Sequence, residues 1–243
     1  MIRAGMGKDR HLRDQKKDFA MKDYERLIRW KFKWLATFYD LFDLTFLLDK
    51  KRNPRYALAS KIPNEPLRIL DVCVGTANSS IVIAEANDQN EIVGIDLSPE
   101  MIAKAKDKIR RRGIRNMSIH KMDAASMSFP HGEFDIAMIS FGLHELGYEL
   151  MMTVLREICR VLKEGGKLYI VDYERPGGIT GLLFSVYLRI FEPKHMPRFL
   201  TYDWAKVLPG AGVQINATEK YPFSKMISAI KRPAASSYEV TRD

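Results

Sequence analysis

Two aspartates, each beside a short apolar run, are the residues of this sequence whose type and spacing best suit chemistry. Asp71 opens the turn DVCVGTAN, and Asp96 follows the run EIVGI, 25 positions later. Small residues in a turn between a strand and a helix let backbone N–H groups approach a ligand closely. A carboxylate at the end of the next strand can accept hydrogen bonds from both hydroxyls of a ribose. Together the two features predict a nucleoside-binding site, and the lack of G-x-G-x-x-G separates it from a dinucleotide fingerprint.

The elements that position these residues alternate between strand-like and helix-like segments. Short runs rich in Ile, Val and Leu are typical of buried strands, and they cover residues 67–72, 91–95, 117–122, 134–140 and 167–172. Helical segments lie between most of these runs, at residues 79–86, 99–111 and 149–162. Ser98-Pro99 is a typical helix start, and the apolar residues Met101, Ile102, Ala105 and Ile109 recur at helical spacing, so the basic side chains of this helix are expected to face solvent. Gly165-Gly166 is expected to end the last helix before the next strand. This alternation predicts an α/β fold with a doubly wound, mainly parallel sheet.

Both ends of the chain add predicted elements. Apolar residues recur at three- and four-residue steps over 24–42, which predicts an amphipathic helix or helix pair. It can pack on the main domain, close over a ligand as a lid, or rest on a membrane surface. Residues 181–191 are expected to form an apolar helix that contributes to the core and walls a pocket for an apolar ligand. Residues 203–208 look helical. Residues 213–220 and 224–231 are expected to form an antiparallel hairpin. We divide the chain into a flexible basic arm (1–20), a helical lid (21–60), a main domain (61–233) and a flexible tail (234–243).

Composition and charge narrow the classes of protein. The 243 residues hold 39 Lys and Arg against 30 Asp and Glu, a net charge of +9, and residues 1–33 alone hold 11 basic and 5 acidic side chains. Such an arm can be a solvated surface, or it can attract nucleic acid, anionic lipid or an acidic partner. No apolar run reaches the ~18 residues of a membrane span, and the chain starts without an apolar secretory signal. We expect a protein of the cytoplasm, in solution or peripherally at a membrane surface.

The two cysteines, Cys73 and Cys159, are expected to be reduced thiols. Two cysteines cannot build a disulfide framework, and these lack the clustered spacing of a zinc site. The sequence therefore predicts no metal site.

In the order of its motifs the sequence resembles the class I S-adenosylmethionine-dependent methyltransferases. The matching segments are ILDVCVGTAN, VGIDLSPEMIAKAK, HKMDA, FDIAMISFGLHEL and LREICRVLKEGGKLYIVDYERP, and the resemblance spans about residues 35–231. More narrowly, the chain is similar to the C-methyltransferases of ubiquinone and menaquinone synthesis, through the FGL before His144 and the spacing from Asp172 to Pro176. The resemblance implies a seven-stranded Rossmann-like sheet with an antiparallel C-terminal hairpin and an N-terminal helical lid.

The chain departs from that family at three places. The family's loop reads D-x-G-x-G-x-G, and Cys73 and Ala77 replace two of its glycines here, a change that the menaquinone branch tolerates. The quinone enzymes usually follow FGL with Arg-Asn, whereas this chain has His144-Glu145, and residues 41–43 (LFD) replace the asparagine-containing motif that follows the N-terminal Tyr-Asp. The resemblance thus implies the class of enzyme more firmly than it implies a quinone acceptor.

The resemblance also implies a cofactor and its binding residues. S-adenosylmethionine would be the methyl donor and S-adenosylhomocysteine the product. Asp71 would steady the loop, Asp96 would hold the ribose hydroxyls, and Asp123 would accept a hydrogen bond from the adenine amino group. The full set of implied cofactor-binding residues is Tyr39 as a lid, Asp71, Gly75 and Thr76 in the loop, Asp96, Leu97 and Met101 after the second strand, Asp123 and Ala124 after the third, and Ser140 beside the sulfonium.

His144 is the candidate catalytic residue, as a general base. A sulfonium methyl is already activated, so the protein chiefly holds the reacting atoms in line. If the acceptor is the ring carbon of a phenol, removal of the phenolic proton raises its nucleophilicity, and a histidine near neutral pKa suits that task. Alternatively, His144 caps a loop or hydrogen-bonds to a backbone carbonyl. His195, between Pro193 and Pro197, is expected to be a loop histidine.

These observations predict a methyltransferase that acts on a small or lipophilic acceptor, such as a quinone-like or phenolic ring carbon. Two other functions stay open: a nucleic-acid methyltransferase, suggested by the basic charge, and a non-catalytic binding module for S-adenosylmethionine that acts through a partner. Enzymes that methylate exocyclic base amines usually carry a Pro-Pro-aromatic motif after the fourth strand. This chain has SFGL there, which disfavours that kind of nucleic-acid enzyme. The sequence does not indicate an oligomeric state.

Overall fold

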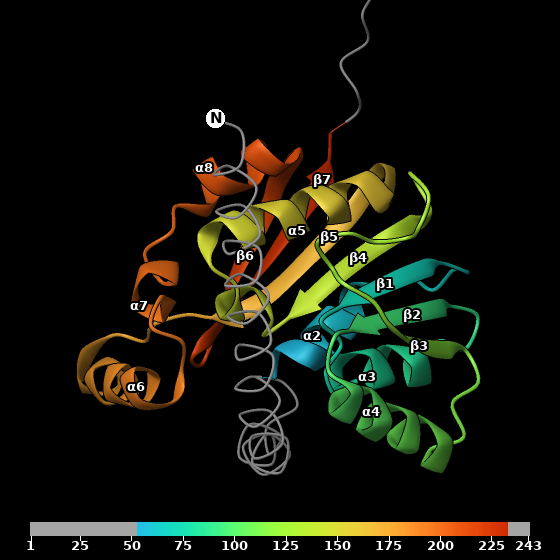
Figure 1. Ribbon diagram of the computed structural model, residues 1–243, viewed down its shortest axis with the longest axis horizontal. Coiled ribbons are helices and arrows are strands. Elements are labelled where there is room, and N and C mark those ends of the chain that lie inside the picture. The colour runs from blue at the N-terminus through green and yellow to red at the C-terminus, as the bar shows by residue number, and fades with distance from the viewer. Residues whose placement is uncertain (1–52, 233–243) are drawn as a thin grey trace, which may run out of the picture. The chain divides into compact units, whose positions relative to one another are not determined.

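The computed structural model describes residues 53–232, which form one seven-stranded sheet with helices on both faces (Figure 1). The strands are β1 (Arg68–Val72), β2 (Glu91–Asp96), β3 (Met117–Lys121), β4 (Phe134–Ser140), β5 (Leu162–Tyr173), β6 (Val213–Tyr221) and β7 (Ser224–Lys231). The helices are α2 (Pro54–Lys61), α3 (Asn78–Ala86), α4 (Pro99–Arg111), α5 (Tyr148–Val161), α6 (Gly178–Phe191), α7 (Met196–Phe199) and α8 (Trp204–Val207), with 3-10 turns η1 (Leu143–Glu145) and η2 (Leu208–Ala211). The predicted basic arm, the tail and most of the lid, with Tyr39, lie outside the described residues.

The order of the strands places a switch point at the middle of the sheet. The order is β3-β2-β1-β4-β5-β7-β6, in which the first five strands run parallel and β7 runs antiparallel to both β5 and β6. Connections from β1 lead to one side of the sheet and those from β4 to the other, so the crevice between their carboxyl ends is where such folds bind ligands. The predicted α/β fold and the C-terminal antiparallel hairpin are confirmed.

Both faces of the sheet are buried, which explains the continuous apolar strands. Ile69 and Leu70 are neighbours in β1, both fully buried, and they point into different clusters. Ile69 packs with side chains of α2 and α3, whereas Leu70 packs with side chains of α5. A strand covered on both faces keeps apolar residues at successive positions rather than at alternate ones.

Helix α4 forms where its cap and its apolar stripe predict. The hydroxyl of Ser98 accepts a hydrogen bond from the backbone N–H of Met101 at 3.2 Å, and Pro99 occupies the first turn. Its buried residues are the predicted stripe of Met101, Ile102, Ala105 and Ile109. The helix packs this stripe beside β3 and leaves most of its basic side chains toward solvent.

The prediction for Gly165 and Gly166 was wrong. Helix α5 ends at Val161 because Leu162 is already extended, and β5 begins there. Phe134 of β4 pairs with Leu162 and Ile136 with Lys167, so the residues between them bulge out of the ladder. Gly165 has φ +72°, and a Cβ on Gly166 would lie 2.8 Å from the carbonyl oxygen of Lys163. The two glycines therefore shape a bulge inside the strand.

Among residues 53–232, no helix has the length and apolar character that crossing a membrane requires. The longest are α5 and α6, each of 14 residues.

Candidate active site

The loop after β1 has the backbone shape of a glycine loop with one glycine in it. Cys73, Gly75 and Ala77 all have positive φ values, 55°, 54° and 64°. L-residues with a Cβ rarely adopt this left-handed conformation, so the three alternate positions are those at which glycine is favoured. They coincide with the glycine positions of the D-x-G-x-G-x-G pattern. Cys73 and Ala77 thus keep the loop shape without glycine.

Asp96 joins this loop to the end of β2. Its Oδ2 accepts a hydrogen bond from the backbone N–H of Gly75, and its Oδ1 from that of Ser98, both at 2.8 Å. Burial raises the pKa of Asp96, and the hydrogen bonds from Ser98 and Gly75 oppose that shift. Each carboxylate oxygen has a second lone-pair direction, so both can still accept a ribose hydroxyl. The structure brings Asp96 to the predicted position, and its ribose contact stays a prediction.

Asp71 is a buried carboxyl group whose hydrogen bonds are incomplete. It accepts a hydrogen bond from the hydroxyl of Ser80, while its Oδ1 has no hydrogen-bond partner within residues 53–232. Burial raises its pKa to about 7, although the bond from Ser80 lowers it, and the charge of Asp96 raises it further. A cationic ligand group beside Asp71 would favour the ionised form. The orphaned oxygen therefore fits a ligand that carries a positive charge.

Thr76 faces away from solvent and is held by a lysine of α4. The ammonium group of Lys108 donates to the hydroxyl of Thr76 at 3.1 Å and to the side-chain oxygen of Asn78 at 2.8 Å. The apolar stripe of α4 predicts only that its charges face solvent, so sequence reasoning missed this tie between helix and loop. A single lysine in a basic helix gives no signal of such a contact.

The residues predicted to surround the adenine lie after β2 and β3. Leu97 is 59% exposed although it is a large apolar residue, and Asp123 is also exposed, with Oδ1 accepting from the backbone N–H of Ala125 at 2.8 Å. Ala124 and Met101 are buried. Leu97 and Asp123 are thus available to a ligand, whereas the side chain of Met101 belongs to the core.

The end of β4 lies against the loop after β1. The hydroxyl of Ser140 is buried and has no hydrogen-bond partner in the part of the chain that the structure describes. Phe141 has φ +54° and donates its backbone N–H to the carbonyl of Val171 at 2.7 Å. A Cβ on Gly142 would lie 2.9 Å from the Cβ of Cys73, so the two loops touch. Burial holds the pKa of the Cys73 thiol well above its usual range, which makes it a poor nucleophile.

His144 is buried in η1 and surrounded by carboxylates. Its Nδ1 lies 2.7 Å from Oδ1 of Asp172, and its backbone N–H donates to Oδ2 of Asp172 at 3.2 Å. Its Nε2 lies 3.5 Å from Oε2 of Glu192 and 3.8 Å from Oε1 of Glu145. Burial alone would lower the pKa of His144, but the charges of Asp172 and Glu192 and the hydrogen bond to Asp172 raise it to about 10. This shift favours the cationic form of the predicted base at neutral pH.

Two further residues, His195 and Tyr173, complete this cluster. His195 donates from Nε2 to the backbone carbonyl of His144 at 2.9 Å, and the hydroxyl of Tyr173 donates to Oε1 of Glu192 at 3.3 Å. Glu192 follows α6, and His195 precedes α7. Sequence reasoning named His144 and His195 but gave no role to Glu192, because contacts across 48 residues leave no local pattern.

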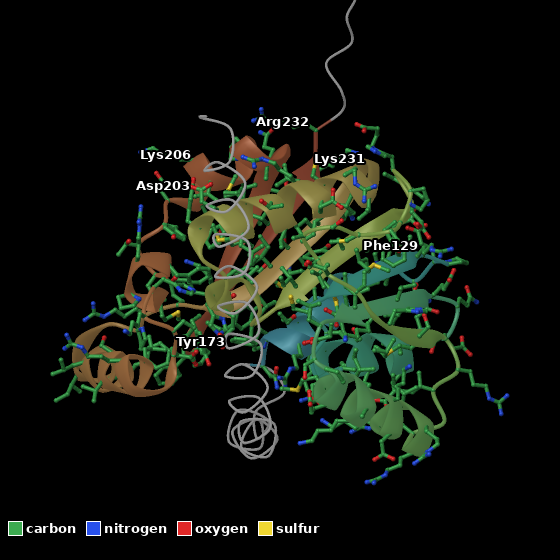
Figure 2. All side chains as sticks on the ribbon, viewed as in Figure 1. Phe129, Tyr173, Asp203, Lys206, Lys231 and Arg232 are labelled. Atoms are coloured by element: carbon green, nitrogen blue, oxygen red, sulfur yellow. The ribbon has the colours of Figure 1, made fainter. Side chains whose placement is uncertain are left out.

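Aromatic rings line the same end of the sheet. Tyr173, at the end of β5 and labelled in Figure 2, has its ring centroid 4.8 Å from that of His144, 5.3 Å from that of Phe141 and 5.7 Å from that of Phe184 in α6. The ring of Phe184 in turn lies 5.1 Å from that of Phe223. The carboxyl ends of β4 and β5 are therefore bounded by an aromatic wall.

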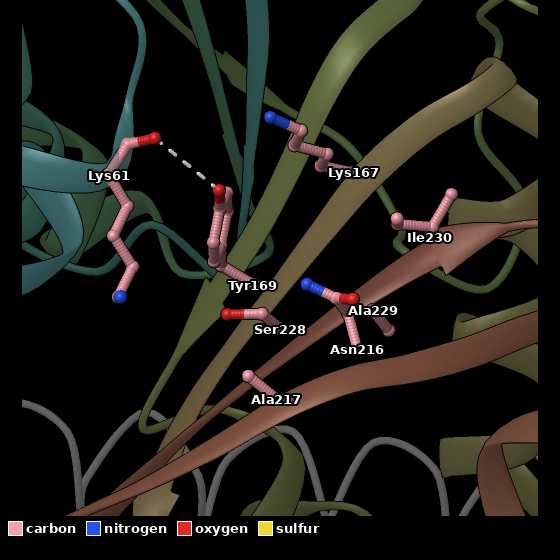
Figure 3. A pocket seen from close by; sticks show the side chains of 8 residues that line it. All are labelled: Lys61, Lys167, Tyr169, Asn216, Ala217, Ser228, Ala229 and Ile230. Carbon is pink, nitrogen blue, oxygen red and sulfur yellow. Dashed lines mark hydrogen bonds between the residues drawn. The ribbon is translucent and has the colours of Figure 1, made fainter.

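A hollow lies away from these residues, beside the middle of β5 (Figure 3). It has a volume of about 230 Å³, and its lining residues are Lys61, Lys167, Tyr169, Asn216, Ala217, Ser228, Ala229 and Ile230. The Tyr169 hydroxyl donates to the carbonyl of Lys61 at 3.5 Å. None of the predicted site residues lines this hollow, so it does not bear on the site.

Comparisons with known proteins agree with the fold. A family model described as a methyltransferase domain matches residues 69–166. The demethylmenaquinone methyltransferase of Listeria welshimeri is 30% identical over 177 residues, which cover 70% of each chain. That of Thermus thermophilus is 34% identical over 162 residues, 65% of this chain and 71% of the relative.

Solved structures add the fold. A SAM-dependent methyltransferase from Aquifex aeolicus matches with a TM-score of 0.61 at 19% identity, covering 78% of this chain and 97% of that one. The [4+2]-cyclase SpnF matches with a TM-score of 0.57 at 23% identity, covering 73% of this chain and 80% of that one. At these sequence identities the solved structures show a similar fold and nothing about function.

The chain belongs to the class I S-adenosylmethionine-dependent methyltransferases, and it is an enzyme of that class. Its cofactor is S-adenosylmethionine and its product S-adenosylhomocysteine. Within the class it is similar to the demethylmenaquinone methyltransferases, so the predicted resemblance is confirmed.

Proposed function

We propose that this enzyme methylates a ring carbon of a small lipophilic phenol or quinol. The observation that carries the proposal is the aromatic wall of Phe141, Tyr173 and Phe184 at the carboxyl ends of β4 and β5. Flat apolar side chains at a parallel-sheet edge suit a flat apolar ligand. The names of relatives such as the Listeria and Thermus enzymes support the same kind of acceptor.

The residues around β1 and β2 are proposed to hold the cofactor. Asp96 takes the ribose hydroxyls, Leu97 and Asp123 take the adenine with the backbone N–H of Ala124, and the backbone of the loop at Gly75 passes the methionine part. The orphaned Oδ1 of Asp71 and the orphaned hydroxyl of Ser140 are the buried polar atoms that the cofactor fits. When bound, S-adenosylmethionine supplies an activated methyl group as a sulfonium. Tyr39, the proposed lid residue, lies outside the described residues.

The protein's task is then chiefly to hold the acceptor in line. Positioning of this kind is worth ~7–11 kcal/mol of the barrier. Methylation of a ring carbon also requires a proton to leave the acceptor, and His144 is the proposed group that receives it. Because the neighbouring carboxylates raise the pKa of His144 to about 10, its base role requires that it first give up a proton to solvent or to Glu145, the more exposed of its neighbours. His144→Gln should therefore lower kcat far more than it weakens cofactor binding.

Helix α6 gives the enzyme an apolar outer face beside the aromatic wall. Ile179, Leu182 and Val186 recur at helical spacing and are 76%, 59% and 52% exposed. Arg175 and Arg189 are exposed near them. An apolar stripe with flanking arginines suits peripheral contact with an anionic membrane, where a lipophilic acceptor would be dissolved. Membrane contact through α6 is part of the proposal.

The test is methyl transfer with labelled cofactor. The full chain is incubated with S-adenosylmethionine labelled in its methyl group and, in separate reactions, with reduced demethylmenaquinone in detergent, a soluble phenol, or total RNA. Label should enter the organic extract of the first reaction, and Asp96→Ala should abolish it. Label that enters only RNA would replace the proposed acceptor with a nucleic acid. A soluble phenol methylated as fast as the quinol would remove the need for a lipophilic tail.

A further inference from the structure

The buried cluster at His144 contains the donor set of a metal centre. His144 Nε2, Oε1 of Glu145 and Oε2 of Glu192 all lie within 4.8 Å of one another. Nε2 lies 3.5 Å from the Glu192 oxygen and 3.8 Å from the Glu145 oxygen. Two ligand atoms that each sit about 2.1 Å from a tetrahedral ion are about 3.4 Å apart. The two distances from Nε2 are therefore within about 0.4 Å of the spacing that one ion would give.

His144 itself points to a ligand. Its side chain is 0% exposed, and Nε2 makes no hydrogen bond to any described residue although it is aimed between the two glutamates. A buried ring nitrogen without a hydrogen bond is costly unless something else binds it. The cluster is thus more than a group of acidic side chains.

The second layer of contacts has the arrangement that metal-binding histidines share. Nδ1 of His144 is held by Asp172 at 2.7 Å, and Asp172 also accepts the backbone N–H groups of His144 and Tyr173. Such carboxylate–histidine pairs fix the ring so that Nε2 faces the metal. Glu192 is fixed in the same way, because Tyr173 donates to its Oε1 and leaves Oε2 toward His144.

Access and charge are also suitable. The Glu145 side chain is 19% exposed, whereas those of His144, Asp172 and Glu192 are 0%, 1% and 2% exposed, so an ion would enter past Glu145. Three carboxylates around one histidine favour a divalent cation. One imidazole nitrogen and two carboxylate oxygens suit a first-row transition metal better than Mg²⁺ or Ca²⁺, which prefer oxygen ligands alone.

We propose that His144, Glu145 and Glu192 bind one divalent transition-metal ion of the Zn²⁺ class, with Asp172 and Tyr173 as positioning residues. Three protein ligands leave a fourth position open, as in zinc sites that bind water or a substrate oxygen. The ring of His144 lies beside the aromatic wall, with its centroid 4.8 Å from that of Tyr173. Cysteine spacing predicts no metal site in this chain, and this cluster uses no cysteine, so the cysteine pattern does not indicate it.

The test measures metal binding directly, without cofactor or acceptor. The full chain is stripped with a chelator, desalted, and titrated with Zn²⁺ by calorimetry, and Co²⁺ is added separately for its visible absorption. Wild type should bind one equivalent of Zn²⁺. Glu192→Gln, which keeps the size of the side chain and its bond to Tyr173, should weaken binding about 10-fold or more, and Asp172→Asn about 10- to 100-fold. His144→Gln should abolish binding.

The matched control is His120→Gln, which removes an exposed histidine of β3 and should bind Zn²⁺ like wild type. If His144→Gln fails to fold, Glu192→Gln decides, with its thermal unfolding and its affinity for S-adenosylmethionine as checks on folding. Wild type that takes up no Zn²⁺, or uptake that the Glu192 and His144 variants leave unchanged, overturns the proposal. An ion on Nε2 would leave His144 no free ring nitrogen, because Asp172 holds Nδ1, so bound Zn²⁺ would exclude the base role proposed for His144. Methyl transfer itself is tested separately, with label and acceptor.

Discussion

The two halves of the sheet edge are built on different principles. After β1 and β2, backbone N–H groups and left-handed residues form a loop that one carboxylate, Asp96, holds at 2.8 Å. After β4 and β5, a buried histidine, three carboxylates and a row of aromatic rings meet. The first half is made of main chain and the second of side chains from distant segments.

The difference matches what each half is proposed to recognise. A nucleoside presents the same hydroxyls and ring edges to every enzyme of the class, and backbone groups in a fixed loop can meet them. An acceptor varies from enzyme to enzyme, and side chains from separate segments can be exchanged one at a time to suit it. If the two halves are independent, a substitution in one half should leave binding at the other unchanged.

The largest effect is expected for His144→Ala. The change leaves Asp172 buried at 1% exposure without the ring that pairs with it, and removal of one partner of a buried charge pair costs about 3–5 kcal/mol. Urea unfolding of the two proteins measures the loss. His120→Ala, an exposed histidine, should stay within about 0.5 kcal/mol of wild type. If His144→Ala lowers the free energy of unfolding by less than about 1 kcal/mol, the buried charge pair of His144 and Asp172 does not stabilise the second half.

The second effect concerns the first half and depends on pH. The pKa of Asp71 is raised to about 7 in the folded protein and is ordinary in the unfolded chain, so from about pH 4 to pH 7 the unfolded chain loses a proton that the folded protein keeps. The free energy of unfolding therefore falls as pH rises through this window, by about 3–4 kcal/mol in total, and this contribution is constant above it.

Asp71→Asn removes the titration and isolates its contribution. The stability of this variant relative to wild type should rise between pH 4 and pH 8 by that amount, as measured by urea unfolding at several pH values. Asp88→Asn, at an exposed position, should show no such trend. A difference between Asp71→Asn and wild type that is constant with pH would show that Asp71 is solvated rather than buried.

The third effect is on the cofactor. Asp96→Ala removes the acceptor of the ribose hydroxyls and also the anchor of Gly75 and Ser98, and hydrogen bonds to a charged group are worth about 1.5–3 kcal/mol each. The Kd for S-adenosylmethionine, measured by calorimetry, should rise about 100-fold, while Asp88→Ala should leave it unchanged. If the two halves are independent, His144→Gln should change this Kd less than threefold. Tight binding by Asp96→Ala would contradict the ribose assignment.

Features that depend on local sequence patterns could be predicted, whereas contacts between separate elements could not. The alternation of strands and helices, the helix cap at Ser98 and the position of Asp96 at the end of β2 follow from local patterns, since each depends on residues close in sequence. The contact of Glu192 with His144 and the tie of Lys108 to Thr76 depend on where separate elements pack. Gly165-Gly166 misled because glycine pairs serve helix ends and strand bulges equally well.

The smallest effect isolates the shape of the loop. Gly75 has φ +54° with open space where a Cβ would lie, so Gly75→Ala adds no clash and keeps the N–H that binds Asp96. An alanine in the left-handed conformation destabilises the folded protein by about 1–2 kcal/mol, and the lower entropy of the unfolded chain offsets part of this. The free energy of unfolding, measured with urea, should therefore fall by about 1 kcal/mol. Gly147→Ala, with φ −63° and equally open space, should change stability by no more than about 0.5 kcal/mol. Equal losses of unfolding free energy in both variants would mean that the left-handed backbone does not define this loop. The first half of the sheet edge would then not be a main-chain site, and the contrast with the side chains of the second half would not hold.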